Sequence, residues 1–145
     1  MVLDLPSLIG VNYIAVIVGA IVSFVIGMIW YSPLLFGKLW IKANGFNEKE
    51  IKEKHKKGMM AKGMVGSIIG ALVMSFVLSV SIHLTQATTL TSGLLIGGFL
   101  WLGFMATAAL NKVLWEGKPV KLYLVEVLHH LVVILVMSAI FVYWI

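Results

Sequence analysis

The sequence predicts an all-α integral membrane protein, a bundle of four transmembrane helices in two helical hairpins that form one domain over residues 1–145. Of the 145 residues, 61% are hydrophobic and 12% are charged. Soluble domains have about half apolar and about a quarter charged residues, so the excess apolar surface must face lipid. The apolar residues also fall into four stretches of about 20 residues, the length that crosses ~30 Å of hydrocarbon.

The lysines between these stretches predict the orientation of the chain. The predicted spans are residues 8–30, 64–84, 90–111 and 122–145. All 11 basic residues are lysines, and they lie within residues 38–62 and 112–121. With four spans both lysine regions fall on one side, so the positive-inside rule predicts a cell (inner, cytoplasmic) membrane protein with its N- and C-termini outside. The net charge of +5 is then a topology signal, and nucleic acid is not expected as a partner.

The first loop, residues 31–63, is predicted to lie on the cytoplasmic face and begins with an aromatic turn. Trp30 and Tyr31 are residue types that concentrate at membrane interfaces. Ser32 can cap a new helix, because its side chain accepts from free backbone N–H groups, and Pro33 suits the first position of that helix.

The rest of this loop is expected to contact lipid headgroups or solvent. Apolar side chains beside Lys38 and Lys42 predict a short interfacial helix. Asn47 and Glu50 have the spacing of a capping box, which opens a helix that can run on into the second span. The lysines of residues 49–62 can attract anionic lipid, or the segment can be a solvated helix whose glutamates dilute that attraction.

Small side chains recur every four residues in the first two spans, where they share one helix face. They are Ala15, Gly19, Ser23 and Gly27 in the first span, and Ser67, Ala71, Ser75 and Ser79 in the second. Small faces let helices approach closely in lipid, so these spans are expected to form a tight hairpin, or some of the faces to form an interface between copies of the chain. The fourth span has no small face and is expected to be peripheral or lipid-facing.

The two hairpins show a possible internal repeat. The residues Leu-Val-Met-Ser occur at 72–75 in the second span and again at 135–138 in the fourth. Each sequence would occupy the second helix of its hairpin, so an ancient duplication of one hairpin is one interpretation of the pattern.

The candidate polar site lies near the start of the fourth span. Glu126 and His130 are four residues apart and share a helix face, with His129 beside them. Ionisable groups inside a membrane are costly and usually face a bundle interior or water. Asn111, near the end of the third span, continues a helical stripe that starts at Gly97 and is expected to hydrogen-bond a neighbouring helix.

Three interpretations of this site remain open. Glu126 can reach the interface while His130 bonds a backbone carbonyl or Asn111. Alternatively, Glu126 and His130 form a protonatable site in a transport path, because histidine titrates near neutral pH. The third interpretation is half of a di-iron site, which needs further glutamates from other helices. The other spans supply no such carboxylate, so no metal is expected.

The sequence also limits the chemistry that can be expected. The chain has no cysteine, which excludes disulfides, thiolate metal sites and cysteine nucleophiles. A recognised phosphate loop, a nucleophile elbow and paired catalytic carboxylates are all missing from the sequence. These features favour a non-enzymatic protein, and no cofactor is expected.

A longer motif follows the first span and identifies a resemblance. Residues 27–40 contain the elements Trp30, Tyr31, Ser32, Pro33, Phe36, Gly37, Lys38 and Trp40. Together with residues 98–104, residues 115–118 and Trp144, the motif resembles the bacterial and archaeal membrane family called domain of unknown function 1761. The resemblance covers nearly the whole chain and implies a four-span membrane protein without implying an activity. The motif can anchor span one in the interface, or line a site with Lys38.

Two functions are consistent with these features. The first is a small transporter or channel-like protein that acts as a homo-oligomer, because four helices enclose little space, and moves an unidentified small molecule or ion past Asn111, Glu126 and His130. The alternative is a non-transporting membrane subunit that binds lipid or a partner protein, suggested by the small-residue faces and the interfacial segment. Membrane lipids are expected partners in both cases.

Overall fold

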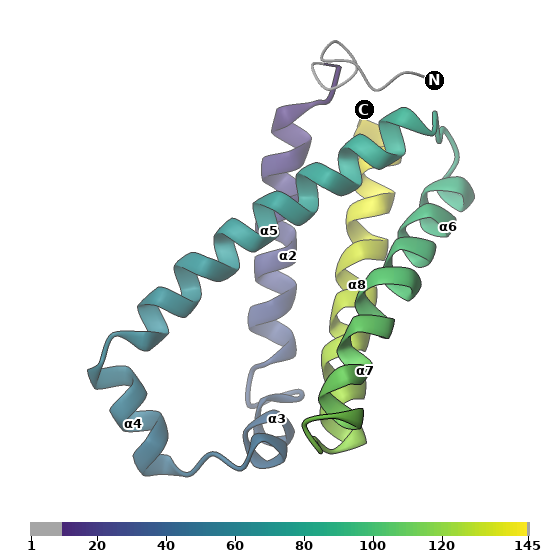
Figure 1. The fold of residues 1–145 in the computed structure, drawn as a ribbon. Helices are drawn as coiled ribbons and strands as arrows, with labels where there is room; N and C mark the ends of the chain where they lie inside the picture. Colours follow the sequence, from purple (N-terminus) through teal and green to yellow (C-terminus); the bar gives the residue numbers. More distant parts are fainter. Residues whose placement is uncertain (1–9, 145) are drawn as a thin grey trace.

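The computed structural model describes residues 10–144, which form helices joined by short turns, with no β-strand in that range (Figure 1). In chain order the elements are α2 (Tyr13–Trp30), α3 (Gly37–Asn44), α4 (Glu48–Lys56), α5 (Met59–Leu84), α6 (Leu90–Leu100), the π-helix η1 (Trp101–Ala106), α7 (Thr107–Leu114) and α8 (Val120–Trp144). The π-helix joins α6 and α7 into one continuous rod. The predicted all-α fold is confirmed.

Within residues 10–144, four segments are long and apolar enough to cross a membrane, so the chain is a membrane-embedded protein. They are Tyr13–Trp30, Met59–Leu84, Leu90–Leu114 and Val120–Trp144. Helix α2 packs against α5, and α6 packs against α8, which gives the two hairpins. The predicted start of the first span at Leu8 and the predicted end of the fourth at Ile145 lie outside the described residues.

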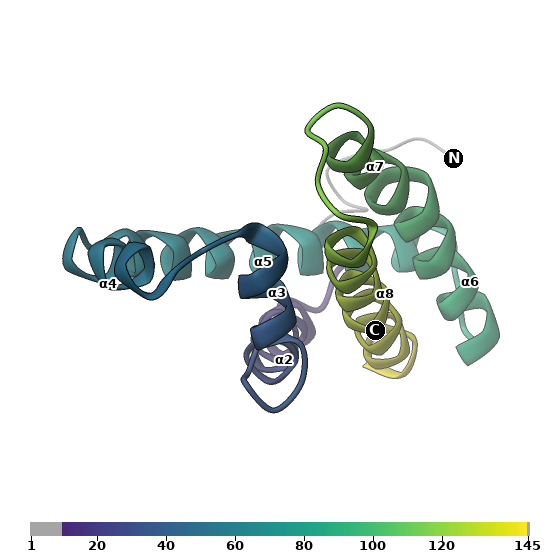
Figure 2. The ribbon, with the colours of Figure 1, turned by 90° about the horizontal axis from the view of Figure 1, so that it is seen from below.

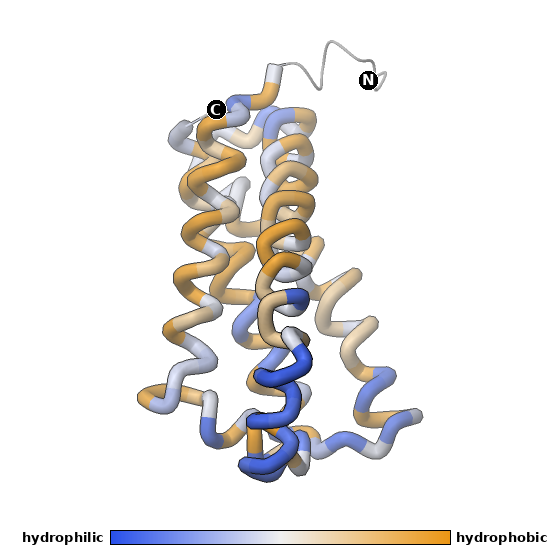
Figure 3. The backbone as a smooth tube through the Cα atoms, turned by 90° about the vertical axis from the view of Figure 1, so that its left-hand side faces the viewer, coloured by the Kyte–Doolittle hydropathy of each residue, from blue (hydrophilic) through white to orange (hydrophobic). Residues whose placement is uncertain are grey.

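Hydrophilic residues gather at one end of the molecule, which we call the lysine-rich end. It consists of α3, α4 and the turn between α7 and α8, and Figure 3 shows the contrast with the apolar helices above it. The predicted capping box of α4 is confirmed: the backbone N–H of Glu50 donates to Asn47 Oδ1 at 2.9 Å, and that of Asn47 donates to Glu50 Oε2 at 3.0 Å. Gly58, at φ 67°, separates α4 from α5, because this left-handed backbone ends a helix.

Helix α8 lies at the centre of the bundle, so the prediction that the fourth span is peripheral or lipid-facing is wrong. It packs against α2, α5, α6 and α7, and the end-on view shows it between α2 and the α6–α7 rod (Figure 2). Its side chains Val133, Met137 and Phe141 are fully buried. These three residues form the middle of the apolar core.

The neighbours of α8 supply the small residues that α8 itself lacks. A Cβ atom added at Gly19 of α2 would lie 2.7 Å from Phe141 Cζ. One added at Gly93 or Gly97 of α6 would collide with Val142 or Ser138. Large side chains of α8 therefore fill hollows left by glycines on the facing helices, which allows close packing without a small face on α8.

The two hairpins share one contact at equivalent positions. In the first hairpin the Ser75 hydroxyl lies against Gly19 and donates to the carbonyl of Val16 at 2.7 Å. In the second the Ser138 hydroxyl lies against Gly97 and donates to a carbonyl of its own helix. In each case the serine of Leu-Val-Met-Ser faces a glycine of the partner helix, and the internal repeat stays a prediction. The expected tight packing of the first two spans is present for the part of α5 from Ala71 onwards, where Ala71, Ser75 and Ser79 are buried, but not at Ser67, which is exposed.

Adjacent glycines on α6 provide a test of this packing. Gly97→Leu should lower the free energy of unfolding by about 1–3 kcal/mol, the usual cost of overpacking a core. Gly98→Leu should leave it unchanged or raise it, because no side chain or neighbouring helix lies within 4 Å of a Cβ atom at Gly98 and leucine favours helix more than glycine does. Thermal unfolding in mild detergent measures both, and equal losses would contradict the packing described.

Candidate functional site

Two tryptophans hold the turn of α8 that carries the predicted polar residues. The indole N–H of Trp30, at the end of α2, donates to the carbonyl of Val125 at 3.1 Å. The indole N–H of Trp101, at the start of η1, donates to the carbonyl of Val127 at 2.7 Å. Because the donors come from two different helices, this turn of α8 is fixed from two sides.

The π-helix changes which face of the third span meets α8. On α6 the buried residues Gly93 and Gly97 are four apart, as in an α-helix. The next fully buried residue is Ala106, five positions after the half-buried Trp101, which is the i→i+5 spacing of a π-turn. The extra residue in this turn rotates the buried face of α7 by one position relative to the buried face of α6.

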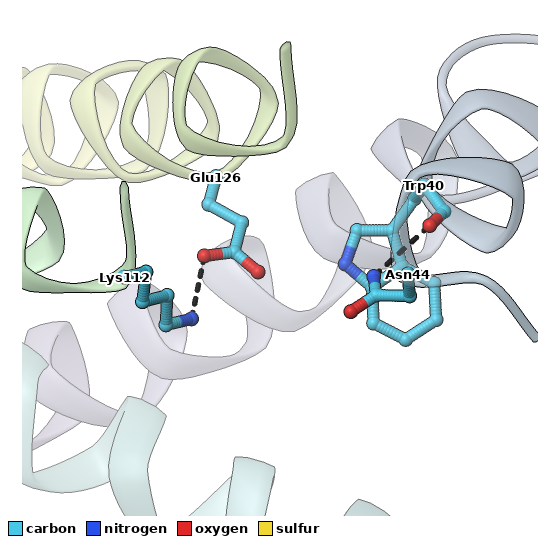
Figure 4. Close-up of polar contacts among 4 residues, drawn as sticks. All are labelled: Trp40, Asn44, Lys112 and Glu126. Carbon is cyan, nitrogen blue, oxygen red and sulfur yellow. Dashed lines mark hydrogen bonds and ion pairs between the residues drawn. The ribbon is translucent and has the colours of Figure 1, made fainter. Parts of the chain in front are cut away.

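This rotation places Lys112, rather than Asn111, against α8. Asn111 is exposed, so the expectation that it continues a buried stripe and bonds another helix is wrong. The Lys112 ammonium instead contacts a carboxylate oxygen of Glu126 at 2.6 Å (Figure 4). The Glu126 side chain is 17% exposed and that of Lys112 is 45% exposed. Glu126 is therefore neutralised by a neighbouring helix instead of reaching the interface alone.

His129 lies in an aromatic environment and has no hydrogen-bond partner. The residue is only 9% exposed, and both ring nitrogens are buried without a partner among the described residues. Its ring centroid lies 5.9 Å from that of Trp30 and 5.1 Å from that of Tyr31. A neutral imidazole has one donor and one acceptor, and an unpaired buried polar group requires an explanation in terms of a missing partner.

His130 lies beside His129, with ring centroids 5.0 Å apart. Its Nδ1 atom is also buried without a partner, so the expected bond to a carbonyl or to Asn111 is not formed by this atom. The charges of Glu126 and Lys112 are close enough to act on the His130 ring. The structure therefore groups Glu126, His129 and His130 as predicted and adds Lys112.

Both imidazoles line a cavity of about 710 Å³ between α2, α5 and α8. Helix α5 leaves the bundle below Ala71 and diverges from α2 towards the lysine-rich end, as Figures 1 and 2 show. The cavity lies in this space between α2 and α5, and α2 contributes Gly27, where an added Cβ atom would lie 3.5 Å from His129 Nε2. Its remaining walls are Ser23, Phe24, Met28, Tyr31, Met60, Met64, Ser67, Gly70, Ala71 and Met74.

The aromatic motif after α2 packs onto this site. The Trp30 ring lies 4.7 Å from Phe36, and the Tyr31 ring lies 5.9 Å from Trp40. Gly37 is buried against the carbonyl of Ser32, 2.7 Å from where a Cβ atom would lie. The segment is therefore a compact turn, and its helix α3 begins at Gly37 and packs against α8.

Two expectations for this motif need correction. The predicted helix start at Ser32 and Pro33 is wrong, because residues 32–36 form turns, closed by hydrogen bonds such as that from Gly37 N–H to the Ser32 carbonyl at 3.0 Å. Lys38 is exposed and does not line the cavity, whereas Tyr31 does. Burial, and secondarily the charge of Glu126, raises the pKa of Tyr31 to about 12, so its phenol remains a neutral donor.

Sequence reasoning missed Lys112, Trp101 and the cavity methionines as parts of the site. Lys112 was counted only as a topology signal, and methionines in apolar helices carry no signal of their own. Among the described residues no group of three or more histidines and carboxylates is arranged so that it could hold a metal ion by itself. The site is thus one ion pair, two unpartnered imidazoles and an apolar, sulfur-containing wall.

Comparison with known proteins identifies a family for the chain. The family described as "Protein of unknown function (DUF1761)" matches residues 14–142, in agreement with the resemblance carried by the aromatic motif. No curated protein and no solved structure matches the chain.

A mutant cycle tests the ion pair. Lys112→Met should lower the free energy of unfolding by about 1–3 kcal/mol, because it leaves the largely buried Glu126 carboxylate without its partner. Adding Glu126→Gln should restore most of this loss, since no buried charge then remains. Lys121→Met, at an exposed position near the start of α8, is the matched control. Unfolding in mild detergent at pH 7 measures the wild type, the two single variants, the double variant and the control, and additive losses from the two substitutions would exclude the pair.

Proposed function

The chain belongs to the DUF1761 family of proteins of unknown function, and from its own geometry we propose that it is a small membrane transporter for a cation. The observation that supports this proposal is a pair of imidazoles whose buried nitrogens have no hydrogen-bond partner among the described residues. They lie on the wall of a cavity inside a membrane-embedded bundle. Polar groups in lipid usually mark ion or substrate paths.

The polar groups are arranged from the surface inwards. Lys112 is half-exposed near the lysine-rich end and pairs with Glu126. Glu126 acts electrostatically on His130, and His130 contacts His129, which lies beside the cavity. A cation entering at the lysine-rich end would exchange its water in steps for the oxygen of Glu126 and the ring nitrogens of His130 and His129, because the Lys112 ammonium has no lone pair to offer. The fixed turn of α8 supports this role, because Trp30 and Trp101 keep the donors in place.

A second candidate is a non-transporting protein that binds lipid or a partner. It is favoured by the cavity wall, which is mostly apolar and lies where α5 diverges from α2, so that an acyl chain could enter sideways. A chain that retains one lipid in native mass spectrometry and carries no flux would favour this alternative.

Flux through proteoliposomes tests transport. Under an imposed membrane potential, the chain should carry protons or monovalent cations, followed with entrapped indicator dyes. Glu126→Gln and His130→Ala should each abolish most of this flux, because they remove groups of the path. His55→Ala, an exposed histidine of α4, is the control and should keep it. Flux unchanged in both site variants would contradict the role given to them.

We further propose the orientation and assembly of the chain. The lysines favour placing the lysine-rich end in the cytoplasm and both termini outside a cytoplasmic membrane. Residues 59–70 of α5 are all exposed, and Gly63, Gly66 and Gly70 face open space within the described chain. A second copy of the chain would cover this half of α5, since small faces favour close helix contacts in lipid.

Single cysteines in the naturally cysteine-free chain test both proposals. Thr88→Cys, in the α5–α6 turn, should react with a membrane-impermeant maleimide on intact cells, and Glu116→Cys, in the α7–α8 turn, only after permeabilisation. Gly66→Cys should form a disulfide-linked dimer on oxidation in the membrane, and the buried Ser79→Cys should not. Reversed labelling would overturn the orientation, and monomeric Gly66→Cys would overturn the assembly.

A further inference from the structure

The cavity contains sulfur as well as nitrogen donors. Met28 of α2 and Met60, Met64 and Met74 of α5 all line it. These are four of the eight methionines in the chain, which has no cysteine. A thioether is a soft, weak donor that can fill apolar space and also bind a soft metal.

The two imidazoles require a partner that the described chain does not supply. Both nitrogens of His129 and the Nδ1 of His130 are buried without hydrogen bonds. His129 is more than nine-tenths buried, and its Nε2 lies 3.5 Å from where a Cβ atom on Gly27, a cavity residue, would be. Leaving such groups unpaired is unfavourable in an apolar site, and a bound cation would use the one lone pair that each neutral ring has.

The spacing of the rings allows them to share one ion. A nitrogen–metal bond of about 2.0 Å places the metal ~3 Å from the ring centroid, so two rings on one ion can have centroids up to about 6 Å apart. The observed separation of His129 and His130 is 5.0 Å. The distance between the rings is therefore compatible with one ion bound by both.

The ligand atoms that line the cavity determine which class of cation it can bind. Hard ions such as Mg²⁺ and Ca²⁺ require several oxygen ligands, but Glu126, the nearby carboxylate, is already paired with Lys112. Imidazole together with thioether instead favours Cu⁺ among biological metals. A monovalent ion also loses less hydration energy than a divalent ion on entering an apolar cavity.

We propose that this cavity binds a soft monovalent cation, Cu⁺, through His129, His130 and thioethers of its methionines. This inference rests on the proposed function, because it names the class of cation that the path would carry. It departs from the expectation of no metal, because thioethers can supply ligands where cysteines and further carboxylates are missing.

Metal binding is measured at equilibrium on the full chain in mild detergent, separately from flux. Under anaerobic, reducing conditions the protein competes with a chromophoric Cu⁺ chelator, and Ag⁺ serves as a redox-inert probe. We expect one ion per chain. His129→Gln should weaken binding by about tenfold or more, the scale of losses at metal sites, and Met64→Leu should weaken it by a smaller factor.

Controls outside the cavity should leave the affinity unchanged. They are Met105→Leu, a methionine packed on the core, and His55→Ala on α4. X-ray absorption of the loaded wild-type chain should show nitrogen and sulfur ligands together, and this readout requires no variant to fold. Absence of stoichiometric binding, ligation without sulfur, or equal affinity in His129→Gln would each overturn the site.

The two proposals can fail separately. Stoichiometric Cu⁺ binding without any flux in proteoliposomes supports the metal site and overturns transport. Flux of protons or other cations without Cu⁺ binding supports transport and overturns the metal site.

Discussion

The contact of glycines on α2 and α6 with α8 is the constraint on which the rest of the structure depends. Gly19, Gly93 and Gly97 have no side chains, so Phe141, Val142 and Ser138 can enter the hollows they leave. This packing puts α8 between the other spans, and the polar residues on α8 become enclosed instead of facing lipid. The matching contact between α2 and α5 extends only as far as Ala71, and below it α5 diverges and leaves room for the cavity. Small residues therefore determine both where the bundle is closed and where it is open.

Much of the fold follows from composition and spacing. The apolar stretches and the four-residue spacing of small side chains predict four spans and the tight contact between α2 and α5. The central position of α8 could not be predicted in the same way, because small residues on one helix determine where its partner lies. A helix rich in leucine, valine and isoleucine suits either lipid or a glycine-lined hollow. The choice depends on the facing helices, and periodicity within α8 contains no information about them.

The candidate site was predictable from the cost of burying charged residues, but Lys112, the partner of Glu126, was not. Glu126 and the two histidines stand out because ionisable residues inside a membrane are rare. Lys112, and not Asn111, faces α8 because the wider turn of η1 rotates α7 by one residue relative to a continuous α-helix. A stripe extended from Gly97 with ordinary α-helical spacing therefore reaches the exposed Asn111 instead of Lys112. The sequence gives no local signal for this turn, since the residues of η1 fit an ordinary apolar α-helix equally well.

The two walls of the cavity differ in the contacts that hold them, and this difference suits a binding site for a mobile cation. The histidine wall is held on α8, where Trp30 and Trp101 donate to the carbonyls of Val125 and Val127. The opposite wall contains Met60 and Met64 on the half of α5 that is exposed along its length. Methionine is flexible and adapts to irregular space. Movement of this half of α5 can therefore bring thioethers to an ion or withdraw them, while the imidazoles remain in place, and the ion can be bound and released without unpacking the glycine-lined core.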